Sequence, residues 1–155
     1  MKKFITFVLV LTCMLSFAGC SSGKSNDGQS GNAVQNKWGI TLEAKNVTPK
    51  GLTILCHQAG GENVAELTTG SFYALQKLEG TKWVDVEYLP QEYEVAWTSE
   101  AWIIRKDSTT QWDVDWAWLY GELPAGKYRI GKHISNFRGP GDSDSETVYA
   151  DFIIE

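Results

Sequence analysis

The fold is decided by residues 111–133, QWDVDWAWLYGELPAGKYRIGKH. Thr110, Trp112 and Val114 alternate with polar residues and predict a strand, and 127–134 predicts another. Between them, residues 123–128 (LPAGKY) have the layout of a tyrosine corner, whose tyrosine hydroxyl bonds back to the upstream backbone and ties two sheets together. The alternative is an ordinary Pro-Gly turn followed by a core tyrosine.

The same two-residue period runs through the rest of the chain from Trp38 onward. Further strands are expected at 40–44, 52–56, 71–78, 82–89, 101–105 and 147–154. Glu79-Gly80-Thr81 predicts a hairpin turn, a polar loop is expected after Gly61, and residues 93–96 are ambiguous. Because no amphipathic helix of useful length is present, we predict an all-β, antiparallel immunoglobulin-like sandwich of about seven to eight strands.

Composition bounds the function. Hydrophobic residues at 43% and charged residues at 21% are typical of a globular domain. A net charge of −5 argues against nucleic acid as a partner, since phosphate binding needs a basic stripe. It argues equally against electrostatic attachment to anionic lipid.

The N-terminus predicts export and lipidation. Lys2 and Lys3 precede an apolar run too short for a stable membrane span, so residues 1–19 are interpreted as a signal peptide. Its end, Phe17-Ala18-Gly19-Cys20, resembles the bacterial lipobox, although that motif usually has leucine where Phe17 stands. The resemblance implies acyl chains on Cys20 and attachment to the extracytoplasmic face of a bacterial cell membrane. The alternative is a plain secretory signal with a chance cysteine.

Cleavage before Cys20 would leave 12 basic and 19 acidic side chains, a net charge of −7. Residues 20–37 contain almost nothing apolar and are predicted to be a tether, and residues 38–155 the folded domain. Cys56 would be the one remaining thiol, so no disulfide within the domain is expected.

Residues 116–129 carry the run W-x-W-L-Y-G-x-L-P-x-G-x-Y-R. Together with Trp83, Val84, Tyr149, Ala150 and Phe152, this run resembles a family of bacterial immunoglobulin-like domains of secreted and lipid-anchored proteins. The resemblance covers residues 39–155. It implies a β-sandwich with no established catalytic residues, sometimes attached to membrane-bound sensors or peptidases.

No catalytic, cofactor or metal site is expected. Cys56 and His57 are neighbours on a strand and point to opposite faces, so they cannot act together as nucleophile and base. We interpret Cys56 as a buried structural cysteine rather than a reactive one. His57 and His133 are interpreted as surface histidines rather than metal ligands, since no partners at ligand spacing accompany them.

The carboxylates give two weak signals. Asp142, Asp144 and Glu146 alternate and could offer oxygens to calcium, but a solvated hairpin loop is the favoured interpretation. Asp113 and Asp115 fit the outward face of an amphipathic strand better than a glycosidase acid pair, which must face each other across a cleft.

Tryptophan is over-represented, since one buried tryptophan typically serves a sandwich core and this domain has seven. The surplus either enlarges the core or forms an exposed contact patch, for which Trp97, Trp102 and Trp118 are the candidates. We therefore expect a membrane-anchored, non-enzymatic binding module with an envelope protein or a glycan as partner. The alternatives are an accessory or regulatory subunit of an envelope peptidase or sensor, and a small carbohydrate-binding domain.

Overall fold

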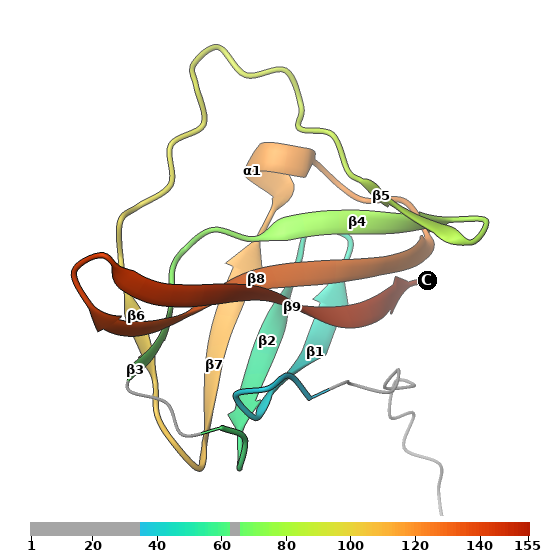
Figure 1. The fold of residues 1–155 in the computed structure, drawn as a ribbon. Helices are drawn as coiled ribbons and strands as arrows, with labels where there is room; N and C mark the ends of the chain where they lie inside the picture. Colours follow the sequence, from blue (N-terminus) through green and yellow to red (C-terminus); the bar gives the residue numbers. More distant parts are fainter. Residues whose placement is uncertain (1–34, 63–65) are drawn as a thin grey trace, which may run out of the picture.

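The structure is a computed structural model that describes residues 35–62 and 66–155. It is a sandwich of two antiparallel sheets (Figure 1). The first sheet, in the order β1-β2-β7, contains β1 (Ile40–Thr48), β2 (Gly51–Gln58) and β7 (Ser108–Asp115). The second contains β3 (Glu66–Thr69), β4 (Ala74–Glu79), β5 (Lys82–Asp85), β6 (Trp102–Ile104), β8 (Gly126–Gly139) and β9 (Asp142–Ile154). A single helical turn, α1 (Ala117–Tyr120), follows β7. The predicted signal peptide, Cys20 and most of the predicted tether lie outside the described residues.

Strand β8 organises the second sheet. It pairs along its length with β9 on one edge, and with β4 and then β3 on the other. Because side chains alternate between the faces of a strand, every second residue of β8 from Tyr128 to Asn136 points into the sandwich. Facing them are the buried apolar side chains of β1, β2 and β7, which form the opposite wall of the core.

The predicted tyrosine corner is confirmed. The Tyr128 hydroxyl donates a hydrogen bond to the Pro124 carbonyl at 2.8 Å, and the ring stacks on Phe152 of β9 with centroids 5.7 Å apart. Trp116 stacks on the same phenylalanine at 5.7 Å, and its indole N–H donates to the Pro49 carbonyl at 2.9 Å. These bonds join the β1–β2 turn and the β7–β8 connection to one end of the core.

Several details differ from the sequence prediction, among them the start of β4, which lies at Ala74 instead of residue 71. The described residues form nine strands rather than seven or eight, because a predicted polar loop contains β3. Leu67 is the one apolar residue of β3, so only its pairing with β6 and β8 defines that strand. Strand β5 ends at Asp85 instead of Leu89, and β9 begins at Asp142 instead of Thr147. The polar start of β9 has no hydrophobic alternation, and it is β-structured because it pairs with β8.

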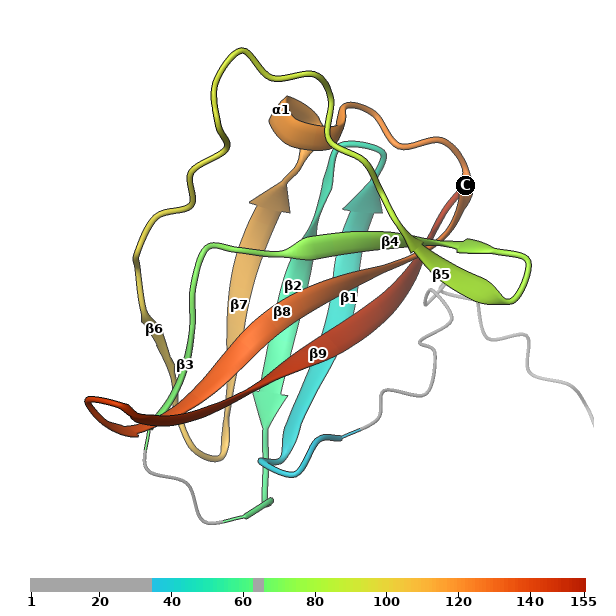
Figure 2. The same cartoon turned by 45° about the horizontal axis from the view of Figure 1, so that its top comes forward.

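The two ends of the sandwich differ in what they carry. One end holds α1 and the long segment between β5 and β6, which arches over it (Figures 1 and 2). At the opposite end the described chain begins, where the Gln35 side chain bonds to the carbonyls of Gly39 and Ala59.

Candidate binding surface at the aromatic end

Aromatic side chains from three separate segments meet beside α1. We call this cluster the aromatic end, and it consists of Phe72, Tyr73, Tyr88, Trp97, Trp118 and Tyr120. They come from the connection before β4, from the segment 86–101 between β5 and β6, and from α1. Sequence positions far apart therefore form one surface, which no local pattern encodes.

Trp97 is the centre of the cluster. Its ring makes edge-to-face contacts with Phe72 at 5.3 Å, Tyr73 at 5.1 Å and Trp118 at 5.9 Å between centroids. Such edge-to-face pairs are favourable beyond the area that they bury. On the other side of Tyr73, Tyr120 packs edge-on against Tyr88 at 5.1 Å.

Backbone and hydroxyl hydrogen bonds fix the segment 86–101 over the sandwich. The Leu89 N–H donates to the Leu119 carbonyl of α1 at 2.8 Å. Near its other end, the Ser71 hydroxyl donates to the Thr98 carbonyl at 3.1 Å and accepts from the Thr98 hydroxyl at 2.8 Å. The segment is thus fastened on both sides of Trp97, although it contains no regular secondary structure.

Some members of the cluster are buried against the core, and others are exposed to solvent. Tyr73 and Tyr120 are buried, and that burial is the main cause of the raised pKa of both hydroxyls. Trp118, Phe72 and Tyr88 keep 53%, 42% and 42% of their surface exposed. The Trp118 indole N–H is already bonded to the Asp115 carbonyl at 3.1 Å, so the ring offers solvent mainly its apolar face.

The segment that contributes Tyr88 and Trp97 to this surface also carries exposed acidic side chains. The segment 86–101 contains Glu87, Glu92, Glu94 and Glu100 and no lysine, arginine or histidine. Near α1, Lys50 is paired with Glu122 at 2.7 Å, and the buried Lys132 ammonium donates to the Phe72 carbonyl from the inner side of the cluster. The aromatic end therefore combines exposed rings with a negative rim.

The structure brings together two of the three tryptophans predicted as contacts. Trp97 and Trp118 belong to the aromatic end, whereas Trp102 lies on β6 and stacks on Trp112 of β7 at 5.9 Å with 19° between the planes. This stack joins the edge strands of the two sheets. Trp102 therefore helps to close one side of the sandwich and makes no ring contact with the other two that the structure shows.

Lys132, which is not among the residues predicted from the sequence, lies beside this stack with only 2% of its surface exposed. Its ammonium group donates to the carbonyls of Gly70 and Phe72, and lies 5.2 Å from the Trp102 ring centroid and 5.9 Å from that of Trp112. Burial lowers the pKa of this lysine to about 8. The position follows from alternation, since Lys132 shares its face of β8 with buried neighbours two residues away on either side.

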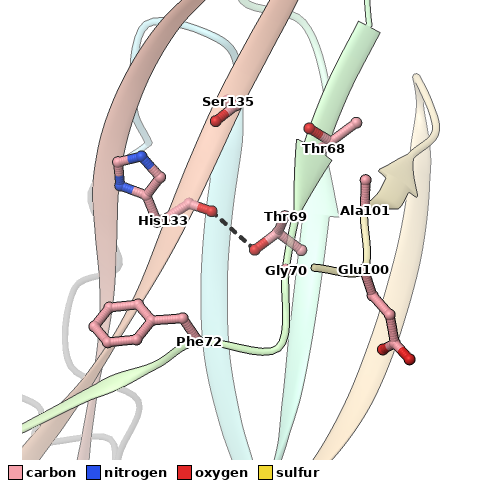
Figure 3. Close-up of a pocket in the computed structure, with 8 residues that line it drawn as sticks. All are labelled: Thr68, Thr69, Gly70, Phe72, Glu100, Ala101, His133 and Ser135. Carbon is pink, nitrogen blue, oxygen red and sulfur yellow. Dashed lines mark hydrogen bonds between the residues drawn. The ribbon is translucent and has the colours of Figure 1, made fainter. Parts of the chain in front are cut away.

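A pocket of about 410 Å³ lies on the outer side of the second sheet, next to the aromatic end (Figure 3). The Phe72 and His133 rings lie on one side of Thr69 in this view and Glu100 lies on the other. The Thr69 hydroxyl donates to the backbone carbonyl of His133 at 2.9 Å. Among these lining residues the structure shows no side-chain hydrogen bond between a hydroxyl and a histidine or carboxylate that would pair a nucleophile with its base.

The remaining candidates for chemistry are engaged in structural contacts. Cys56 is fully buried, as predicted, and burial raises the pKa of its thiol to about 12. His57 is bonded through Nδ1 to the Thr109 hydroxyl at 2.9 Å and lies 3.5 Å from Glu43. Asp113 accepts a hydrogen bond from the Thr53 hydroxyl at 2.7 Å.

The three carboxylates considered as calcium ligands, Asp142, Asp144 and Glu146, are hydrogen-bonded to other side chains, two of them to an arginine. Arg138 donates to Asp142 at 2.6 and 2.9 Å and to Asp144 at 2.9 Å, while Glu146 accepts from the Asn36 amide at 3.4 Å. Within the described residues no group of three or more potential ligands could hold a metal ion. Nor does the described part of the chain contain a helix long and apolar enough to cross a membrane.

The two sheets and the tyrosine corner define an immunoglobulin-like β-sandwich. Residues 35–153 match the family of bacterial Ig-like domains, and the chain belongs to that family. Such domains are typically non-catalytic, and no enzyme family was found in the chain. Neither the curated proteins nor the solved structures that were searched contain a match.

Proposed function

We propose that this protein is a non-enzymatic binding module, anchored by lipid at Cys20 on the extracytoplasmic face of a bacterial membrane. The observation that carries the binding role is the aromatic end, where Trp118 and Phe72 remain about half exposed beside Trp97. Contiguous exposed aromatic surface on a soluble domain is typical of an interaction site, and tryptophan and tyrosine are enriched at binding hot spots.

The position of this surface supports the same function. Gln35, at the start of the described chain, lies at the end of the sandwich opposite to α1 (Figure 2). An anchor at Cys20 would attach the domain at that opposite end. The point of attachment would then lie opposite to the aromatic end, which leaves that end accessible to a partner in the envelope.

The test is photo-crosslinking in cells with benzoylphenylalanine in place of Trp118. The matched control carries the same group in place of Phe137, which is 46% exposed on the β8–β9 hairpin, remote from α1. We expect a discrete crosslinked product from position 118 only. Equal products from both positions, or none from 118, would refute the binding role.

The anchor has a separate test. Cys20→Ala should abolish incorporation of labelled fatty acid, whereas Cys56→Ala, which changes the buried thiol, should leave it intact. Labelling that survives Cys20→Ala would refute lipidation at this residue.

A further inference from the structure

We infer that the aromatic end docks a segment of another protein that presents arginine or lysine side chains together with apolar ones. This inference rests on the proposed binding function and specifies its partner. It is carried by three observations: the distribution of cations over the tryptophans, the charge around the aromatic end, and the shape of the exposed surface.

The first observation is that lysine or arginine side chains of the domain lie over most of its indole rings. Lys37 lies over Trp38, Lys127 and Arg129 lie over Trp83, and Lys132 lies over both members of the Trp102–Trp112 stack. Trp116 is fully buried against Phe152.

Trp97 and Trp118 are the exceptions, because no lysine or arginine of the described chain lies over either ring. Trp118 contacts Trp97 at 5.9 Å between ring centroids and keeps 53% of its surface exposed. The face of an indole attracts a cation through its quadrupole, and arginine is the side chain found there most often. The open ring is therefore a cation-binding surface that the described chain does not occupy.

The second observation is the charge. Four glutamates lie within the segment 86–101 without a basic residue among them, and the nearby Lys50 is held by Glu122. These carboxylates attract a positively charged partner and repel anionic lipid and acidic proteins. Ring face and rim thus favour the same sign of charge on the partner.

The third observation is the shape and size of the surface. Besides Phe72 and Trp118, the exposed apolar side chains here include Tyr88 and Leu89, which contact α1, and the same segment carries Tyr93, which is 84% exposed. These side chains are distributed over an area of the domain surface that a polypeptide segment can cover and a single small cation cannot. Interfaces between proteins combine such aromatic anchors with arginine, as this surface requires.

The test uses the full-length protein in detergent and three peptides of equal length that alternate leucine with arginine, serine or glutamate. Binding is measured by calorimetry and by tryptophan fluorescence. We expect saturable binding of the arginine peptide, at least about tenfold tighter than that of the serine peptide, and none of the glutamate peptide. Added salt should weaken it.

Two pairs of variants locate the site. Trp118→Ala should weaken the arginine peptide about fivefold or more, whereas Phe137→Ala, which removes an equally exposed ring elsewhere, should not. The double change Glu92→Gln and Glu94→Gln should weaken it about threefold or more, whereas the same change at two exposed glutamates elsewhere should have less effect. The control pair is Glu62 and Glu79.

The outcomes separate this inference from the proposed function. If the serine peptide or a panel of neutral oligosaccharides binds as tightly as the arginine peptide, and Trp118→Ala abolishes that binding, the cationic partner is refuted and the binding end stands. If neither Trp118→Ala nor the change of Glu92 and Glu94 affects any binding, both are refuted.

Discussion

Because Lys132 is buried, we expect the free energy of unfolding of this domain to rise with pH in the alkaline range. One substitution at this position should remove that rise. In the folded state burial lowers the pKa of Lys132 from 10.5 to about 8, and no carboxylate compensates for it among its hydrogen-bond partners, which are the carbonyls of Gly70 and Phe72. At about 1.36 kcal/mol per tenfold change in acidity, the difference corresponds to about 3 kcal/mol.

The sign follows from proton binding in the two states. Below pH 8 the lysine is charged in both the folded and the unfolded chain, so folding carries the full cost of burying the charge. Between 8 and 10.5 the unfolded chain holds a proton that the folded protein has lost, and stability therefore rises with pH. Above 10.5 the lysine is neutral in both states and this cost is absent.

We therefore expect Lys132→Met, which keeps the length and the apolar part of the side chain, to abolish this rise. The measurement is the free energy of unfolding in urea, followed by circular dichroism from neutral pH to above 10.5. From the lower to the higher pH, wild type should gain about 3 kcal/mol relative to Lys132→Met. Cys56, whose thiol pKa burial raises to about 12, acts in the opposite direction in both proteins, and the charge of Lys132 lowers that pKa in wild type only.

The matched control is Lys127→Met, on the same strand but on its outer face, where the lysine pairs with Asp151 at 3.5 Å. This variant should retain the wild-type pH dependence. Parallel pH curves for wild type and Lys132→Met would refute the argument. The difference at neutral pH is less informative, because methionine removes the buried charge and also leaves two carbonyls without their donor.

The same unfolding assay checks three further substitutions. Tyr128→Phe removes the hydrogen bond of the tyrosine corner and should cost about 1 kcal/mol; no loss would show that ring packing alone holds the corner. Gly131→Ala would put a methyl group 2.7 Å from the Tyr149 ring, so we expect about 1–3 kcal/mol of destabilisation that Tyr149→Ala largely relieves. Gly61→Ala places a side chain 2.3 Å from backbone at a φ of +82° and should destabilise more than Gly60→Ala, which meets only open space at +66°; equal losses would contradict the role of close approach.

The candidate site was only partly predictable. The surplus of tryptophan in the sequence predicts Trp97 and Trp118 as contact residues, and their ring centroids lie 5.9 Å apart in the structure. Trp102 was selected on the same grounds but lies in a stack that joins the sheets. Alternation along β6 and β7 directs Trp102 and Trp112 to the inner faces of their sheets, but only the packing of the two sheets brings these edge strands into contact.

The sequence by itself determined the class of fold, the tyrosine corner and the inward direction of Cys56. These depend on a two-residue period and a short turn, which are local properties of a strand and its ends. Tertiary structure decided that the polar segment of β3 is a strand, that Lys132 is covered by two indoles, and that residues 72, 97 and 118 form one surface. The physical reason is that strand pairing, cation–ring contacts and loop packing join residues that are distant in the chain. These contacts form only when the strands have paired and the two sheets have packed together.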